Sequence, residues 1–106
     1  MELKDLFKFI EVEDRKLEKK YGSLSNKEEW ILARTVKLGE EFGELCEEVL
    51  AYNSLQRRQK LDNHDEESLQ EEFADVIITA LLLAKSMNIN IETALEKKMQ
   101  KLNQRV

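Results

Sequence analysis

Asp75 is the charged residue whose place in the sequence points most clearly to chemistry. It is the only charged residue from Phe73 to Ala84, a stretch that is apolar on every side of a helix. A carboxylate left unpaired in such surroundings loses several kcal/mol in desolvation. We therefore expect Asp75 to be neutral, paired or bound to a metal ion. Glu72 lies one turn earlier on the same face, and two acids so placed repel each other unless a cation lies between them.

Two further acids, Glu41 and Glu44, lie on an earlier helix at the edge of its apolar stripe. If the two helices pack as antiparallel neighbours, these acids face Glu72 and Asp75. Four carboxylates form an all-oxygen ligand set, which suits Mg²⁺ or Mn²⁺. A solvated helix surface is the alternative for Glu40, Glu41 and Glu44 taken alone, and the apolar context of Asp75 shifts the balance towards a metal site.

The sequence disfavours iron and zinc as the metal. It has one histidine, His64, in a predicted loop, and it lacks the Glu-x-x-His motif of di-iron bundles. Zinc prefers His and Cys ligands. The single cysteine, Cys46, has no His or Asn near it in the sequence, so we expect a packing or surface residue rather than a nucleophile.

Lys98, Lys101 and Arg105 form one basic stripe, because they fall at i, i+3 and i+7 on the last predicted helix. Together with Lys37 they would hold the phosphate oxygens of a ligand bound beside the carboxylates. An ordinary solvated face is the alternative for this stripe. Trp30 is a candidate for stacking on a nucleotide base, although a tryptophan at the start of a helix is more often packed against its neighbours.

The elements that must position these residues are predicted to be helices. Pro is absent and Gly occurs three times, so the turns that a many-stranded fold needs are missing and an all-α fold is favoured. Hydrophobic periodicity predicts helices over residues 2–20, 26–57, 67–87 and 91–104, with a polar loop at 59–66.

Local signals mark the helix ends and one packing face. Ser25 followed by Glu28 predicts a capping box, and Asn90 predicts the N-cap of the last helix. An apolar stripe on the second helix, from residue 31 to 52, indicates antiparallel bundle packing. Gly39 and Gly43 interrupt this helix, which suggests the close approach of a neighbouring helix.

The bulk properties limit the class of protein. A chain of 106 residues is enough for one domain, residues 1–106. The net charge of −5 argues against a nucleic-acid binder, and no apolar run is long enough to span a membrane. With no signal peptide at Met1, a cytoplasmic protein is expected. The helix at 67–87 is too apolar for so short a chain to cover, so we expect a partner subunit.

Two short motifs resemble those of a known family. Residues 40–44 read Glu-Glu-Phe-Gly-Glu, and residues 72–75 read Glu-Phe-Ala-Asp. The pair resembles the E-E-x-x-E … E-x-x-D signature of the MazG-like, all-α NTP pyrophosphatase superfamily. Residues 88–95 resemble the following turn and helix start, and residues 101–105 resemble the closing Lys-x-x-x-Arg. The resemblance covers about residues 27–106.

The resemblance implies an enzyme that hydrolyses a nucleoside triphosphate, or its deoxy form, to the monophosphate and pyrophosphate. It implies a four-helix bundle completed by oligomerisation, as a homodimer or a dimer of dimers. The Mg²⁺ ligands that it implies are Glu41, Glu44, Glu72 and Asp75. Glu40 lies nearby as a further ligand or a water-orienting base. In the mechanism that we expect, Glu40 or Glu41 accepts a proton from the water that attacks the α-phosphate or orients that water, and Lys98, Lys101 and Arg105 hold the β- and γ-phosphates.

Other functions remain open at this point. A phosphoribosyl-ATP pyrophosphatase or a dUTP hydrolase would share the same site, because nothing in the chain identifies the base. A non-catalytic helical interaction protein is a different class, in which the acids pair with Lys37 and the basic residues of the last helix.

Overall fold

The chain folds into four helices, in a computed structural model that describes residues 1–22, 26–53 and 66–105. They are α1 (Leu3–Lys20), α2 (Lys27–Asn53), α3 (Glu66–Ser86) and α4 (Ile91–Asn103). The described ranges contain no strand, which confirms the predicted all-α class. Glu66, predicted to lie in the loop, is the first residue of α3. Ser25, His64, the rest of the predicted loop and the predicted helix end at residue 57 lie outside the described residues.

Asparagine side chains begin two of the helices. The Oδ1 atom of Asn26 accepts a hydrogen bond from the backbone N–H of Glu29 at 2.9 Å, and its Nδ2 donates to the Glu29 carboxylate at 3.3 Å. Asn26 therefore caps the start of α2, whereas the predicted capping box included Ser25, which lies outside the described residues. Asn90 Oδ1 accepts from the backbone N–H of Thr93 at 3.1 Å, which confirms the predicted N-cap of α4.

A left-handed residue redirects the chain between α3 and α4. Asn88 has a φ of 55°, a conformation that Asn adopts more readily than most residues other than Gly. The backbone N–H groups of Ile89 and Asn88 donate to the carbonyls of Ala84 and Lys85 at 3.0 and 3.2 Å. This is the Schellman pattern of helix termination. The axes of α3 and α4 consequently meet at a bend of 113°.

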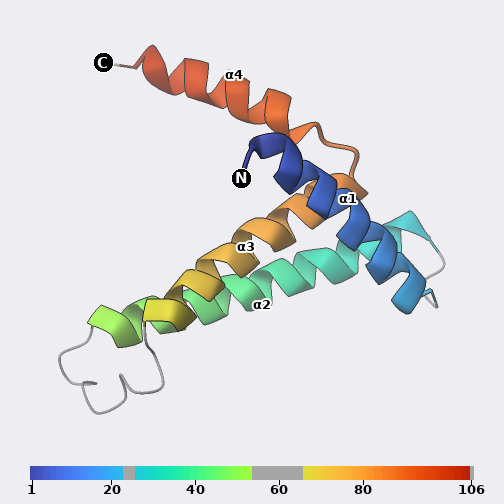
Figure 1. Cartoon of the computed structure of the whole chain (residues 1–106), viewed down its shortest axis with the longest axis horizontal. Helices are drawn as coiled ribbons and strands as arrows, with labels where there is room; N and C mark the ends of the chain where they lie inside the picture. The colour runs from blue at the N-terminus through green and yellow to red at the C-terminus, as the bar shows by residue number, and fades with distance from the viewer. Residues whose placement is uncertain (23–25, 54–65, 106) are drawn as a thin grey trace.

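The helices α2 and α3 form the centre of the molecule as antiparallel neighbours (Figure 1). The helix α1 packs on the C-terminal half of α3, and α4 projects away from the other helices. Beyond Ile91, every described residue of α4 is exposed. In the described ranges, no single helix has the length and apolar composition needed to cross a membrane, although α3 and α4 pass that test together as a bent pair.

The interior of this single chain is small. Among the described residues, its buried apolar side chains are Ile10, Ala51 and Leu82. Phe42 and Tyr52, which belong to the stripe predicted to pack, are exposed. The α2–α3 contact therefore covers only one side of each helix.

A buried arginine joins three helices at one end of the α2–α3 pair. The Nη1 atom of Arg34 donates to the Asp14 carboxylate at 2.6 Å, to the hydroxyl of Ser86 at 2.6 Å and to the carbonyl of Leu82 at 3.1 Å. The ring of Trp30 lies 4.9 Å from the guanidinium carbon. These contacts fix α1, α2 and α3 relative to one another, and Trp30 is part of that packing.

Candidate metal centre

The antiparallel contact of α2 and α3 brings three predicted ligands together. One carboxylate oxygen from each of Glu41, Glu72 and Asp75 lies within 4.8 Å of the other two. Oxygens bound to opposite sides of one divalent cation, at 2.0–2.6 Å from it, are about 4–5 Å apart. The three carboxylates are therefore close enough to share a single cation with little movement.

The burial of the three side chains differs. Glu41 is only 8% exposed, Glu72 is half-buried and Asp75 is exposed. One oxygen of Glu41 and one of Glu72 are buried without a hydrogen-bond partner. A buried carboxylate oxygen without a partner is costly. A hard cation would satisfy both atoms, so the donor set and its unsatisfied oxygens fit a divalent metal ion.

The exposure of Asp75 contradicts the sequence argument that its helix leaves it no water. Within one chain, α3 is covered only where α2 and α1 pack on it. Phe73 and Ile77, on the same half of the helix, are also exposed. The desolvation argument applies instead to Glu41, which sequence reasoning placed at the edge of the packed stripe.

Glu44 and Glu40 lie beside this cluster without joining it. Both are exposed, and Glu44 is close enough for its charge to act on Glu72. The ammonium of Lys37 lies 3.6 Å from the Glu40 carboxylate and 3.2 Å from that of Glu41. Lys37 is therefore a counter-charge for the cluster, as well as a predicted phosphate ligand.

The crowding of acids is reflected in two shifted pKa values. Burial raises the pKa of Glu72, and the charges of Glu44, Asp75, Glu41 and Glu48 raise it further. The hydrogen bond to Glu41 and the charge of that carboxylate raise the pKa of Lys37. Among the described residues, the site thus holds more negative charge than Lys37 offsets, which favours a cation.

The other predicted phosphate ligands lie elsewhere in the chain. Lys98 and Lys101 are on α4 and Arg105 follows it, and all three are exposed on the arm that leaves α3 (Figure 1). Trp30 precedes Glu41 by about three helical turns, or about 16 Å along α2. The structure therefore brings only Lys37, among the predicted substrate-binding residues, to the carboxylates of its own chain.

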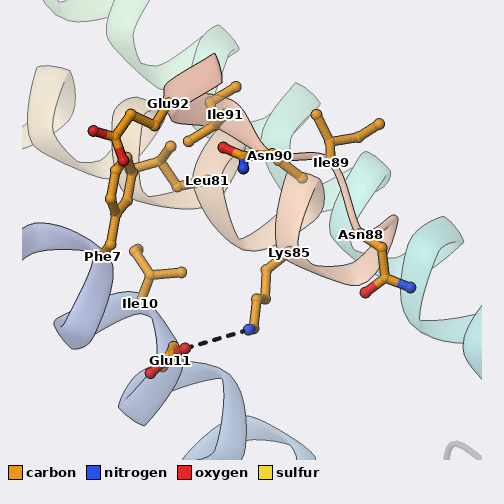
Figure 2. Close-up of a pocket in the computed structure, with 11 residues that line it drawn as sticks. Phe7, Ile10, Glu11, Leu81, Lys85, Asn88, Ile89, Asn90, Ile91 and Glu92 are labelled. Carbon is orange, nitrogen blue, oxygen red and sulfur yellow. Dashed lines mark ion pairs between the residues drawn. The ribbon is translucent and has the colours of Figure 1, made fainter. Parts of the chain in front are cut away.

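A cleft of about 390 Å³ lies between α1, the end of α3 and the start of α4. Figure 2 shows its apolar wall, which includes Phe7, Ile10 and Leu81, and the ion pair of Glu11 and Lys85 at 3.7 Å. A second cleft adjoins Trp30 and Asp14. The lining residues of these two clefts include none of the three clustered carboxylates.

Comparison with known proteins identifies the region that carries the cluster. Residues 31–106 match the family model described as MazG nucleotide pyrophosphohydrolase domain. The chain is also similar to the uncharacterized protein YpjD of Bacillus subtilis (strain 168), with 36% identity over 74 residues. That match covers 70% of this chain and 65% of YpjD, which is less than two-thirds of the relative's length. No solved structure matches the chain.

Proposed function

The chain belongs to the MazG nucleotide pyrophosphohydrolase family, and on that premise we propose that it hydrolyses nucleoside triphosphates, or their deoxy forms, to the monophosphate and pyrophosphate. The observation that carries the proposal is the cluster of Glu41, Glu72 and Asp75, whose oxygens lie within 4.8 Å of one another inside the family region. Buried oxygens without partners support its role as a metal centre rather than a solvated surface.

In this proposal Glu41, Glu72 and Asp75 hold Mg²⁺, with Mn²⁺ as a substitute, and exposed Glu44 is the fourth ligand. The bound ion would polarise the α-phosphate and lower the pKa of a bound water. The chain contributes the arrangement of the acids. Burial between two helices fixes Glu41 and Glu72, so little reorganisation is needed when substrate binds.

Glu40 is the proposed general base, because it is exposed beside the cluster and paired with Lys37. Its carboxylate would accept one proton from the water that attacks the α-phosphorus. The bond from the α-phosphorus to the bridging oxygen breaks, and pyrophosphate leaves with that electron pair. Glu41 is the alternative base, although its burial and its contact with Lys37 favour a role as ligand.

The phosphate-binding cations would come from a second subunit. Lys98, Lys101 and Arg105 lie on an arm whose described residues are all exposed beyond Ile91. The same arm exposes the apolar residues Leu95, Met99 and Leu102. We propose that the arm packs on another copy, in a dimer or a dimer of dimers, and brings its basic stripe to that copy's carboxylates.

Pyrophosphate release with Mg²⁺, measured over a panel of ribo- and deoxynucleoside triphosphates, tests this function. We expect Asp75→Asn to lower the rate at least about 100-fold, because an amide is a much weaker ligand for a hard cation. Glu67→Gln, which removes an exposed acid two turns earlier on α3, is the matched control and should keep the wild-type rate. Wild-type pyrophosphate release from folded Asp75→Asn protein would sink the metal assignment.

The same panel separates the specific alternatives. Activity confined to dUTP indicates a dUTP hydrolase, and activity on phosphoribosyl-ATP alone indicates that class of pyrophosphatase. A non-catalytic interaction protein is also supported by one observation, the pairing of Lys37 with Glu40 and Glu41. Mg²⁺ should raise the melting temperature of an enzyme with this metal site, and the absence of any effect of Mg²⁺ or nucleotide would favour the interaction protein.

A further inference from the structure

The side of α2 that faces away from α3 is apolar and open. Leu32, Val36 and Leu50 are 66%, 63% and 67% exposed there. The stripe on this side, which we name the α2 seam, consists of Leu32, Val36, Gly39, Gly43, Cys46 and Leu50. We propose that the α2 seam is an interface with a second copy of this chain, separate from the contact proposed for α4, and that the two copies pack antiparallel about a two-fold axis at the level of residue 41.

The spacing of the α2 seam supports a symmetric partner. Its residues follow one another by steps of four, three, four, three and four, the alternation that keeps one face of a helix against another. Counted outward from residue 41, the spacings are the same in both directions, and residues of similar size occupy the matching positions. An antiparallel two-fold contact therefore pairs Leu32 with Leu50 of the partner subunit, Val36 with the partner's Cys46 and Gly39 with the partner's Gly43.

The two glycines are not explained by the packing of a single chain. A Cβ atom added at Gly39 or Gly43 would meet nothing within 4 Å. Glycine weakens the interior of a helix, so both positions are unfavourable in an isolated chain without any compensating contact. At the centre of the α2 seam they let a second helix approach closely.

The amount of exposed surface also favours a second copy. The chain exposes 8480 Å², whereas a compact monomer of 12.5 kDa exposes about 6,200 Å². Phe42, next to Gly43 in the chain, is 59% exposed as well, so exposed apolar side chains of α2 extend beyond the α2 seam. Because large, medium and small positions mirror each other, a second α2 matches the α2 seam position by position.

A disulfide test follows from the pairing of Val36 with the partner's Cys46. In Val36→Cys protein oxidised with diamide, we expect most of the chain to become a covalent dimer on a non-reducing gel. Wild-type protein should stay uncrosslinked, because the two Cys46 residues lie about 15 Å apart along the pair of helices. Val36→Cys combined with Cys46→Ala should also stay uncrosslinked.

Leu50→Cys is the matched control, because it is equally exposed on the same helix. In the proposed register it faces the partner's Leu32, about 20 Å from the partner's Cys46, so it should form no covalent dimer. The proposal is overturned if Val36→Cys protein does not crosslink, or if Leu50→Cys crosslinks equally well. Crosslinking of the wild type through Cys46 would indicate a parallel pair and would overturn it too.

Gly39→Ala and Gly43→Ala give a second readout that requires no oxidant. Each should raise the helix content of the isolated chain while weakening the dimer at least tenfold in analytical ultracentrifugation. Unchanged or tighter dimerisation of folded variants contradicts the α2 seam. Neither measurement involves metal or nucleotide, so failure of this interface is distinguishable from failure of the proposed function.

Discussion

Glu72 carries the strongest electrostatic strain among the described acids. One of its oxygens is buried without a partner, and burial together with four neighbouring carboxylates raises its pKa. The folded protein therefore holds a proton on Glu72 more tightly than the unfolded chain does. A cation that binds between Glu72, Glu41 and Asp75 would offset the same crowding of negative charge.

This strain predicts how Glu72→Gln changes stability with pH. When folding raises the pKa of a carboxyl, that group does not affect the free energy of unfolding at pH values below its pKa in the unfolded chain. It destabilises the fold as pH rises through its pKa in the folded protein. Metal-free Glu72→Gln should thus be more stable than the wild type at pH 7.5 and equal to it near pH 4. Urea unfolding at the two pH values measures the difference.

Mg²⁺ should reverse this order near neutral pH. It should stabilise the wild type, because the ion binds only the folded cluster, and it should have little effect on Glu72→Gln. A variant that is less stable than the wild type at both pH values, with or without Mg²⁺, would show that Glu72 is a structural residue rather than part of a cation site.

At the scale of the helices, two ion pairs connect α1 to the centre of the molecule in different surroundings. The side chains of Arg34 and Asp14 are 8% and 13% exposed, and those of Lys85 and Glu11 are 43% and 57% exposed. A buried pair costs most when one partner is lost, because the remaining charge stays buried and uncompensated. An exposed pair contributes little to stability.

We therefore expect Asp14→Asn to destabilise the protein by about 3 kcal/mol. Glu11→Gln, which removes the exposed pair on the same helix, should change stability by less than about 0.5 kcal/mol. Chemical denaturation followed by circular dichroism measures both. Equal effects of the two substitutions would mean that the Arg34 contacts do not hold the three helices together.

At the scale of the whole molecule, the single chain is extended. Its radius of gyration is 16.8 Å, whereas a compact domain of this length has about 13 Å. Every described residue of α4 beyond its first is exposed, and α2 leaves the α2 seam uncovered. A chain of this shape gains stability from association.

The melting temperature should consequently depend on protein concentration. For a dimer of this size, a tenfold increase in concentration should raise it by roughly 3–6 °C. Differential scanning calorimetry over a 100-fold range of concentration measures the effect, and Glu67→Gln should show the same dependence. An identical melting temperature throughout that range would indicate a protein that is stable as a monomer.

The local features of this fold could be predicted from the sequence, and the long-range ones could not. Periodicity and turn residues predict four helices, and the cap at Asn90 is confirmed. Spacing also indicated the acids that the structure brings together. The exposure of Asp75 escaped prediction, because periodicity shows what a helix can bury and not what the chain provides to cover it. The burial of Arg34 also escaped prediction, because it depends on contacts with α1 and α3 that the helix pattern of α2 does not specify.

The position of α4 escaped prediction for a related reason. The sequence indicated that a helix ends near Asn88. The 113° bend between α3 and α4 follows from the left-handed backbone conformation of Asn88, which the sequence did not specify. The predicted phosphate ligands therefore lie away from the carboxylates of their own chain. Their role as substrate ligands remains a prediction that depends on a second subunit.

The contacts of Lys37 affect how the acidic cluster would bind a divalent cation. Its ammonium already serves as the counter-ion of Glu41 and Glu40, so a divalent cation that binds Glu41 would take the place of Lys37 at that carboxylate. The ammonium would keep its flexible stem and its charge, and would become available to an incoming anion once Glu41 is bound to the ion. Loading would therefore prepare the site for phosphate.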